Sequence, residues 1–298
     1  MKAHEHIRAI RDRAAKEPVV CAENAIARIN KISDIRAVVF DIYGTLISSG
    51  VGDISLSSKS NSNDALYYTL FNQGIEVLPA SDSTHLDALL LESIKYFQRK
   101  RSKEGVCYPE VEIREVWKYF LEKLLTKKLI NPLRADLDIE GLIIDYECRV
   151  NPTQAMPGLV DTLNELHQRG LKISIISNAQ FYTPLLFDAL IGKSLSELNI
   201  CMDCAIWSYV LREAKPSQRL YELSANHLFR TYQIDPKQVL YVGNDIRNDI
   251  WPAQSVGFKT ALFAGDKLSL RRRKEDPQCK HIEADLEITQ LHQLLDCL

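Results

Sequence analysis

Long apolar runs and a strong charge imbalance are both missing from this chain of 298 residues. No stretch approaches the roughly 20 apolar residues that a membrane-spanning helix requires, so we expect no membrane contact. The formal net charge is only −2, which disfavours a nucleic acid or another polyanion as partner. The basic cluster at residues 271–274 is followed at once by Glu275 and Asp276, a mixed pattern that predicts a solvent-exposed loop.

A regular cysteine framework is missing as well. The seven cysteines are irregularly spaced and no apolar signal segment opens the chain, which predicts free thiols in a reducing cytoplasm. Cys201 and Cys204 form a CxxC, but no second CxxC or CxxH follows, so a zinc site would lack half its ligands. We expect a small-molecule substrate as partner, and a homo-oligomer is possible.

The apolar and charged contents, 46% and 26%, are typical of a globular protein large enough for a core and a smaller insert. Residues 1–32 show helical periodicity before and after Pro18 and predict an N-terminal helical extension. Residues 54–150 carry apolar residues at helical spacing in about four segments, without a credible strand. Residues 33–53 and 151–298 alternate strands with helices, including a closing helix through Ile288 and Leu291. Such alternation requires a parallel, doubly wound sheet, so the chain is predicted to be α/β.

The central motif lies at residues 38–46, where an apolar run leads to Asp41 and then to Gly44. An apolar run without alternation predicts a strand that is buried on both faces. Asp41 then lies at the carboxyl end of the strand, the edge where parallel sheets bind ligands. Gly44 allows the sharp turn that must follow.

Three further motifs follow in the chain. Residues 173–178 form an apolar strand that ends in a hydroxyl at Ser177. Lys215 precedes Pro216 and a long helix, and residues 239–249 form an apolar strand that ends in Asp245 and Asp249. A carboxylate can act as a nucleophile when its electrophile is held in line and neutralised, a task suited to Lys215.

These four motifs, in this order, resemble those of the haloacid dehalogenase (HAD) superfamily. The resemblance implies a Rossmann-like parallel core with an inserted all-helical cap that closes over the nucleophile. It also implies that Asp41 is the nucleophile, that Lys215 is catalytic and contacts substrate, and that Thr45, Ser177 and Asn178 bind substrate.

Hard oxygen donors at Asp41, Asp245 and Asp249, with the backbone carbonyl of Tyr43, predict a Mg²⁺ site completed by water. In a structural alternative, Asp245 caps the helix that begins near Arg247, and Asp249 favours the positive end of that helix.

Tyr43 departs from the superfamily's phosphatases, which commonly carry a second aspartate there as general acid and base. Tyrosine at this position is similar to the superfamily's 2-haloacid dehalogenases, which use no metal. The two acids of the fourth motif instead favour phosphate chemistry. We expect a Mg²⁺-dependent phosphatase that acts on a small phosphorylated metabolite through an aspartyl-phosphate. A 2-haloacid dehalogenase and a catalytically weak phosphate-binding or regulatory protein are the alternatives.

Overall fold

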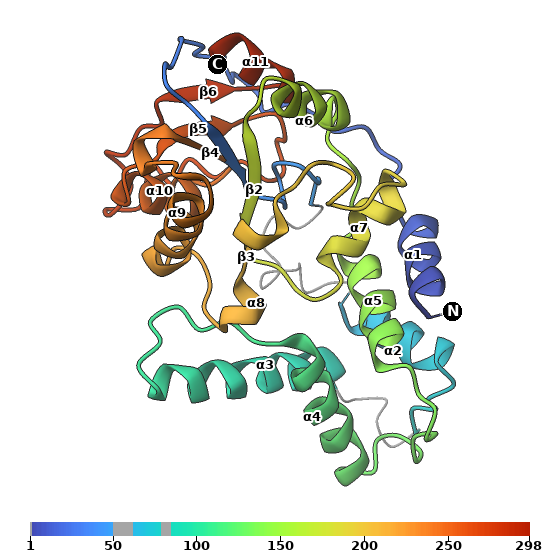
Figure 1. The fold of residues 1–298 in the computed structure, drawn as a ribbon. Helices are drawn as coiled ribbons and strands as arrows, with labels where there is room; N and C mark the ends of the chain where they lie inside the picture. Colours follow the sequence, from blue (N-terminus) through green and yellow to red (C-terminus); the bar gives the residue numbers. More distant parts are fainter. Residues whose placement is uncertain (1, 50–61, 79–84) are drawn as a thin grey trace.

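A six-stranded parallel sheet forms the core of the protein in a computed structural model, which describes residues 2–49, 62–78 and 85–298 (Figure 1). The strand order is β3-β2-β1-β4-β5-β6, and each neighbouring pair is parallel. The strands are β1 (Ala37–Phe40), β2 (Lys172–Ser177), β3 (Ile206–Trp207), β4 (Val239–Gly243), β5 (Lys259–Phe263) and β6 (Leu286–Ile288). The predicted α/β doubly wound fold is confirmed.

Strand β1 is buried on both faces, as its unbroken apolar run predicts. Val38 and Phe40 point into one apolar cluster, whereas Ala37 and Val39 point into a second cluster on the other face. The chain leaves β1 toward β2 on one side and reaches β4 on the other, so the winding of the sheet reverses at β1. Ligand sites of open α/β sheets lie at such a reversal, beyond the carboxyl ends of the strands.

The helices of the core alternate with the strands as the sequence predicts, except at residues 286–288, where a strand replaces the predicted start of the last helix. They are α6 (Leu159–Gln168), α7 (Thr183–Leu190), α8 (Ser208–Leu211), α9 (Gln218–Tyr232), α10 (Trp251–Ser255) and α11 (Leu294–Cys297), with a π-helical turn, η5 (Ile246–Ile250), before α10. The predicted closing helix through Ile288 is wrong at its start, because Leu286 and Ile288 alternate with Glu287 and form the edge strand β6. The chain turns helical only after Gln290.

The described part of the insert, which follows β1 in the chain, contains four helices. They form a separate layer below the sheet (Figure 1). They are α2 (Ser62–Asn72), α3 (Leu86–Lys103), α4 (Ile113–Thr126) and α5 (Ile139–Val150). The apolar stripe of α4 is buried, and Trp117 packs edge-to-face on Phe120 and Tyr146 at centroid distances of 5.4 and 5.3 Å. The predicted start of the cap near Gly52 lies outside the described residues.

The N-terminal segment is helical only in its first part, α1 (Lys2–Asp12). The helix predicted after Pro18 is wrong, since residues 18–36 contain no helix. Val20 and Ile26, which belonged to the predicted stripe, are 60% and 80% exposed. The backbone of this stretch is satisfied by the core instead, because Arg28 exchanges two hydrogen bonds of 2.8 and 3.1 Å with Glu287 of β6.

Helix α1 packs against α5 of the insert and α7 of the core (Figure 1). Ile10 is buried in this contact at 1% exposure. His6 Nε2 lies 2.8 Å from Asp138 at the start of α5, and Arg11 donates to the carbonyl oxygen of Ala189 in α7 at 3.0 Å. The N-terminal helix therefore ties the insert to the core. Among the described residues, no helix has the length and apolar character needed to cross a bilayer.

The replacement Ile10→Ala is expected to lower the free energy of unfolding by about 2–5 kcal/mol, because it leaves a cavity where α1 meets the two helices. Ile26→Ala, at an exposed position of the same segment, should change it by no more than about 0.5 kcal/mol. Urea unfolding of both variants measures the difference. Equal effects would mean that α1 is not packed as described.

Candidate active site

Asp41 follows β1 directly and is 4% exposed. Its backbone N–H donates to the carbonyl of Val242 in β4 at 2.9 Å, which holds the residue against the neighbouring strand. Oδ1 accepts hydrogen bonds from Lys215 Nζ at 2.6 Å and Ser177 Oγ at 3.0 Å. Oδ2 accepts none from the described residues. One carboxylate oxygen is therefore fixed, and the other is uncommitted.

Lys215 joins two carboxylates. Its Nζ lies 2.6 Å from Oδ1 of Asp41 and 2.6 Å from Oδ1 of Asp249, and all three side chains are buried. Burial by itself lowers the pKa of Lys215, but the charges of Asp249 and Asp41 outweigh it and raise the pKa above its ordinary value. The ammonium group is therefore charged at any physiological pH.

Asp249 is held on all sides by protein donors. Oδ1 also accepts from the Tyr241 hydroxyl at 3.0 Å, and Oδ2 accepts from the backbone N–H groups of Asn244 and Asp245 at 3.0 and 2.9 Å. A Cβ on Gly243 would lie 2.4 Å from Cγ of Asp249, so glycine is required for this approach. These contacts hold the Asp249 carboxylate in the position from which it accepts the hydrogen bond of Lys215.

Asp245 is also engaged. Oδ1 accepts from the backbone N–H groups of Arg247 and Asn248 at 2.8 and 3.3 Å, the cap contact of the structural alternative. The Arg273 guanidinium donates to both carboxylate oxygens, at 3.0 and 2.5 Å. Arg273 belongs to the basic cluster that the sequence assigned to an exposed loop. The two partners are 28 residues apart, with η5, α10 and β5 between them, so no local periodicity in the sequence indicates the pair.

The predicted substrate-binding residues Ser177, Asn178 and Thr45 lie next to the catalytic candidates. The side chain of each makes a hydrogen bond to another residue of the protein. Ser177 donates to Asp41, and the Asn178 side-chain oxygen accepts from the Lys215 backbone N–H at 2.8 Å. Thr45 is fully buried and donates to the side-chain oxygen of Asn244 at 3.2 Å. Their predicted role in binding substrate stays a prediction.

Tyr43 is buried, and its hydroxyl lies 3.0 Å from Oγ1 of Thr183. It lines a small cavity together with Glu147 of α5 and Tyr182. Burial raises the pKa of Tyr43 above its ordinary value, so the phenol stays protonated at neutral pH. Burial also raises the pKa of Glu147 to about 7, against an opposing hydrogen bond with Tyr182. Sequence reasoning missed Glu147, because one acid in an amphipathic helix carries no distinguishing signal.

The four predicted Mg²⁺ donors divide into two pairs. Asp245 and Asp249 have both oxygens engaged, and the described residues contain no cluster of three or more His, Cys, Asp or Glu side chains suited to a metal. Oδ2 of Asp41 and the carbonyl oxygen of Tyr43 accept no hydrogen bond from the described residues. Mg²⁺ in proteins needs only one or two carboxylates beside water and substrate phosphate. The residues therefore fit Mg²⁺ through this smaller donor pair.

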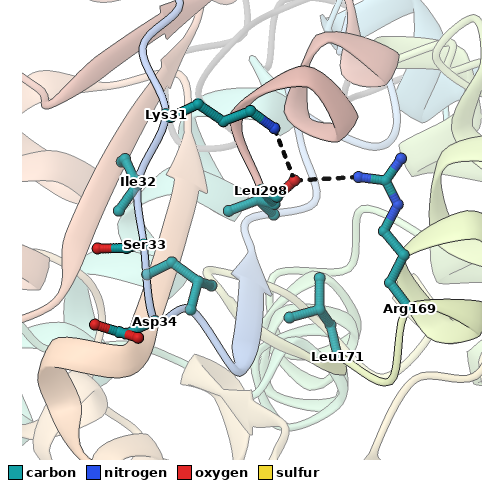
Figure 2. A pocket seen from close by; sticks show the side chains of 8 residues that line it. Lys31, Ile32, Ser33, Asp34, Arg169, Leu171 and Leu298 are labelled. Atoms are coloured by element: carbon teal, nitrogen blue, oxygen red, sulfur yellow. Dashed lines mark hydrogen bonds between the residues drawn. The ribbon is translucent and has the colours of Figure 1, made fainter.

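A larger cavity of about 390 Å³ lies away from Asp41 (Figure 2). Ile35 and Leu171, which precede β1 and β2, line it at the amino ends of the strands. Lys31 and Arg169 both donate to the main-chain oxygen of Leu298 there. Asp41 lies six residue steps of extended chain beyond Ile35, about 20 Å, so this cavity is not part of the Asp41 site.

A family model described as haloacid dehalogenase-like hydrolase matches residues 35–257, well over half of the chain. The chain is a haloacid dehalogenase-like hydrolase. The resemblance drawn from the four motifs is confirmed.

This hydrolase is similar to curated proteins over most of its length. It is 27% identical to the phosphoglycolate phosphatase of Salmonella paratyphi A over 232 residues, 77% of this chain and 81% of the relative. The Escherichia coli K12 phosphoglycolate phosphatase is 26% identical with the same coverage. A HAD phosphatase from Thermococcus onnurineus has a similar fold, with a TM-score of 0.50, 20% identity and coverage of 88% of this chain and 97% of that chain.

The replacement Glu147→Gln is expected to stabilise the hydrolase at high pH only. Between about pH 4.5 and 7 the folded state holds a proton that the unfolded chain has lost, so wild-type stability falls as the pH rises through this window. The variant should therefore match the wild type near pH 4.5 and gain at most about 3 kcal/mol above pH 7.

Thermal unfolding at several pH values measures this difference, with the exposed Glu122→Gln as control. A gain that does not depend on pH would show that the Glu147 carboxyl is not held in its neutral form.

Proposed function

We propose that this hydrolase is a phosphatase that removes phosphate from a small metabolite through an aspartyl-phosphate at Asp41. The observation that carries the proposal is the asymmetry of the Asp41 carboxylate: Lys215 and Ser177 hold Oδ1, whereas Oδ2 is uncommitted. A nucleophile needs such a free oxygen on a side chain that cannot rotate away. The phosphatase names of the relatives support phosphate over halide as the group acted on.

In the proposed reaction, Oδ2 of Asp41 attacks phosphorus, and the bond from phosphorus to the leaving oxygen breaks with its electron pair; the leaving oxygen takes a proton from solvent. The Lys215 ammonium keeps Oδ1 neutralised, and Asp249 holds the ammonium in place. Water then attacks phosphorus and releases a proton to solvent, the bond to Oδ2 breaks, and inorganic phosphate leaves with the Asp41 carboxylate restored. Positioning and charge stabilisation supply most of the catalysis in such transfers.

The charges of the site support Mg²⁺ as cofactor. Asp41 and Asp249 oppose the single ammonium of Lys215, and Asp245 is already neutralised by Arg273. One negative charge is left over before a phosphate dianion arrives, so a further cation is needed. We propose that the Tyr43 carbonyl and one lone pair of Asp41 Oδ2 hold Mg²⁺, without Asp245 or Asp249, while the other lone pair of Oδ2 remains for attack on phosphorus. Bound there, the ion would neutralise and orient the phosphate.

A dehalogenase reaction is the second candidate, and Tyr43 is the observation that favours it. The buried phenol can neither protonate a leaving alcohol nor activate water readily at neutral pH. Displacement of halide from carbon needs no such proton donor. Halide release from 2-chloropropionate in the presence of chelator, without phosphate release from any ester, would establish this reaction. Binding of phosphate mimics without turnover of either substrate would indicate a regulatory protein.

Asp41→Asn is expected to reduce phosphate release by at least about 10³-fold, because the variant has no carboxylate to form the intermediate. The panel is p-nitrophenyl phosphate and 2-phosphoglycolate, each with and without Mg²⁺. Asp145→Asn is the matched control, a buried carboxylate outside the site that should keep most of the activity. If Asp41→Asn turned over substrate at the wild-type rate, Asp41 would not be the nucleophile.

Tyr43→Asp is expected to speed hydrolysis of esters with poor leaving groups, because it restores a proton donor two residues from Asp41. The gain should grow with the pKa of the leaving alcohol, within the roughly 10²–10⁴-fold range of general acid catalysis. Tyr43→Phe, which removes the hydroxyl without adding an acid, should show no such trend. A uniform loss across leaving groups in Tyr43→Asp would instead assign Tyr43 to substrate binding.

A further inference from the structure

The segment between α3 and α4 of the insert pairs with the core next to Lys215. The Ala214 N–H donates to the carbonyl of Tyr108 at 2.8 Å, and the Glu110 N–H donates to the carbonyl of Arg212 at 3.1 Å. Pro109 and Glu213 form the antiparallel bridge between these bonds. The insert thus shares main-chain hydrogen bonds with the residue immediately before the catalytic lysine.

Gln180, three residues beyond Ser177, makes a second connection. Its Nε2 donates to the carbonyl of Val111 at 2.9 Å, and its Oε1 accepts from the Ile113 N–H at 3.0 Å. The side chain is 5% exposed, so no solvent replaces these bonds while the segment is docked. A buried amide satisfied at both ends specifies one position for its partner.

Ser208 makes a third connection. Its Oγ accepts from the Ala179 N–H at 2.9 Å and lies 3.0 Å from Oε2 of Glu110. Because Ser208 is fully buried, the hydroxyl links the residue before Gln180 to the same insert segment.

The stretch that receives these contacts also touches the catalytic candidates. Asn178 Oδ1 accepts from the Lys215 N–H at 2.8 Å. The Gln180 N–H donates to Thr183 Oγ1 at 3.1 Å, and the same oxygen lies 3.0 Å from the Tyr43 hydroxyl. A shift of residues 178–180 would therefore move the contacts of both Lys215 and Tyr43.

We propose that Gln180 is a positioning residue: its side-chain amide, bound to the insert at residues 111–113, sets the place of Lys215 against Asp41. The inference rests on the proposed roles of Asp41 and Lys215. A general closure of the insert over the site would not require this amide. Here the docked segment acts on Lys215 through the one buried amide of Gln180 and the backbone of residues 178–180.

Hydrogen exchange tests the coupling without any assay of turnover. In Gln180→Ala, exchange should become about tenfold faster or more in a peptide of residues 108–113, which loses its direct partner. It should also become faster at the Lys215 N–H, which bonds to Asn178 and to no residue of the insert. Glu115→Gln is the control, because it breaks only the exposed ion pair with Arg212 between the same segments and should leave both rates unchanged.

Kinetics on p-nitrophenyl phosphate test the catalytic consequence. Misplaced Lys215 predicts that kcat falls by about tenfold or more in Gln180→Ala, while KM changes by less than about twofold. Faster exchange at residues 108–113 with the Lys215 N–H unchanged, or a higher KM with kcat unchanged, would overturn the proposal. If wild-type protein hydrolyses no phosphate ester, the proposed function fails and the exchange of the Lys215 N–H still decides the coupling.

Gln180→Met covers the case in which the alanine variant does not fold. It keeps the approximate size of the side chain and loses both bonds, to Val111 and to Ile113. It should show the same pattern of exchange and kcat. Wild-type rates in this variant would overturn the proposal.

Discussion

The buried ammonium of Lys215 between Asp41 and Asp249 is the interaction on which the site depends. Asp41 at the end of β1 and Asp249 in the turn η5 after β4 could not lie so close without this cation, because like charges repel strongly where water is excluded. Removing one member of such a buried set typically costs about 3–5 kcal/mol, since the remaining charge has no counterion. The Tyr241 hydroxyl and the tight approach at Gly243 hold Asp249 so that Lys215 cannot leave.

The same arrangement limits the chemistry. One oxygen of Asp41 is held in place, which leaves the other as the reactive atom, and the surplus negative charge calls for a cation before a phosphate can approach. Asp245 supplies no further charge because Arg273 neutralises it. In the proposed phosphatase reaction, Tyr43 stands in the place of an acid, so proton transfer to the leaving group becomes the weak step. Under this proposal, we expect esters with stable leaving groups to be the better substrates.

Strands β1, β2 and β4 and their order along the chain could be predicted from the sequence, since an apolar run buried on two faces is a local signal, whereas the short edge strand β6 was expected to be helical. Strand β2 ends at Ser177 as predicted, and Asp41, Ser177 and Asp249 meet because parallel strands end at one edge and η5 follows β4 there. Contacts between distant irregular segments could not be predicted. The Asp245–Arg273 pair and the docking of Gln180 on the insert depend on tertiary placement, not on periodicity. The helix predicted after Pro18 is absent from the described residues 18–36: Val20 and Ile26 are exposed and do not form a packed stripe, and the backbone of Arg28 bonds to β6 instead.

Chemical trapping of the intermediate tests the central claim most directly. During turnover of a phosphate ester, rapid quenching and borohydride reduction should convert the phosphorylated aspartate to homoserine, which peptide mass spectrometry can locate. The account predicts conversion at Asp41, and none in Asp41→Asn or without substrate. Conversion at another carboxylate, or sustained turnover with no conversion at Asp41, would contradict it.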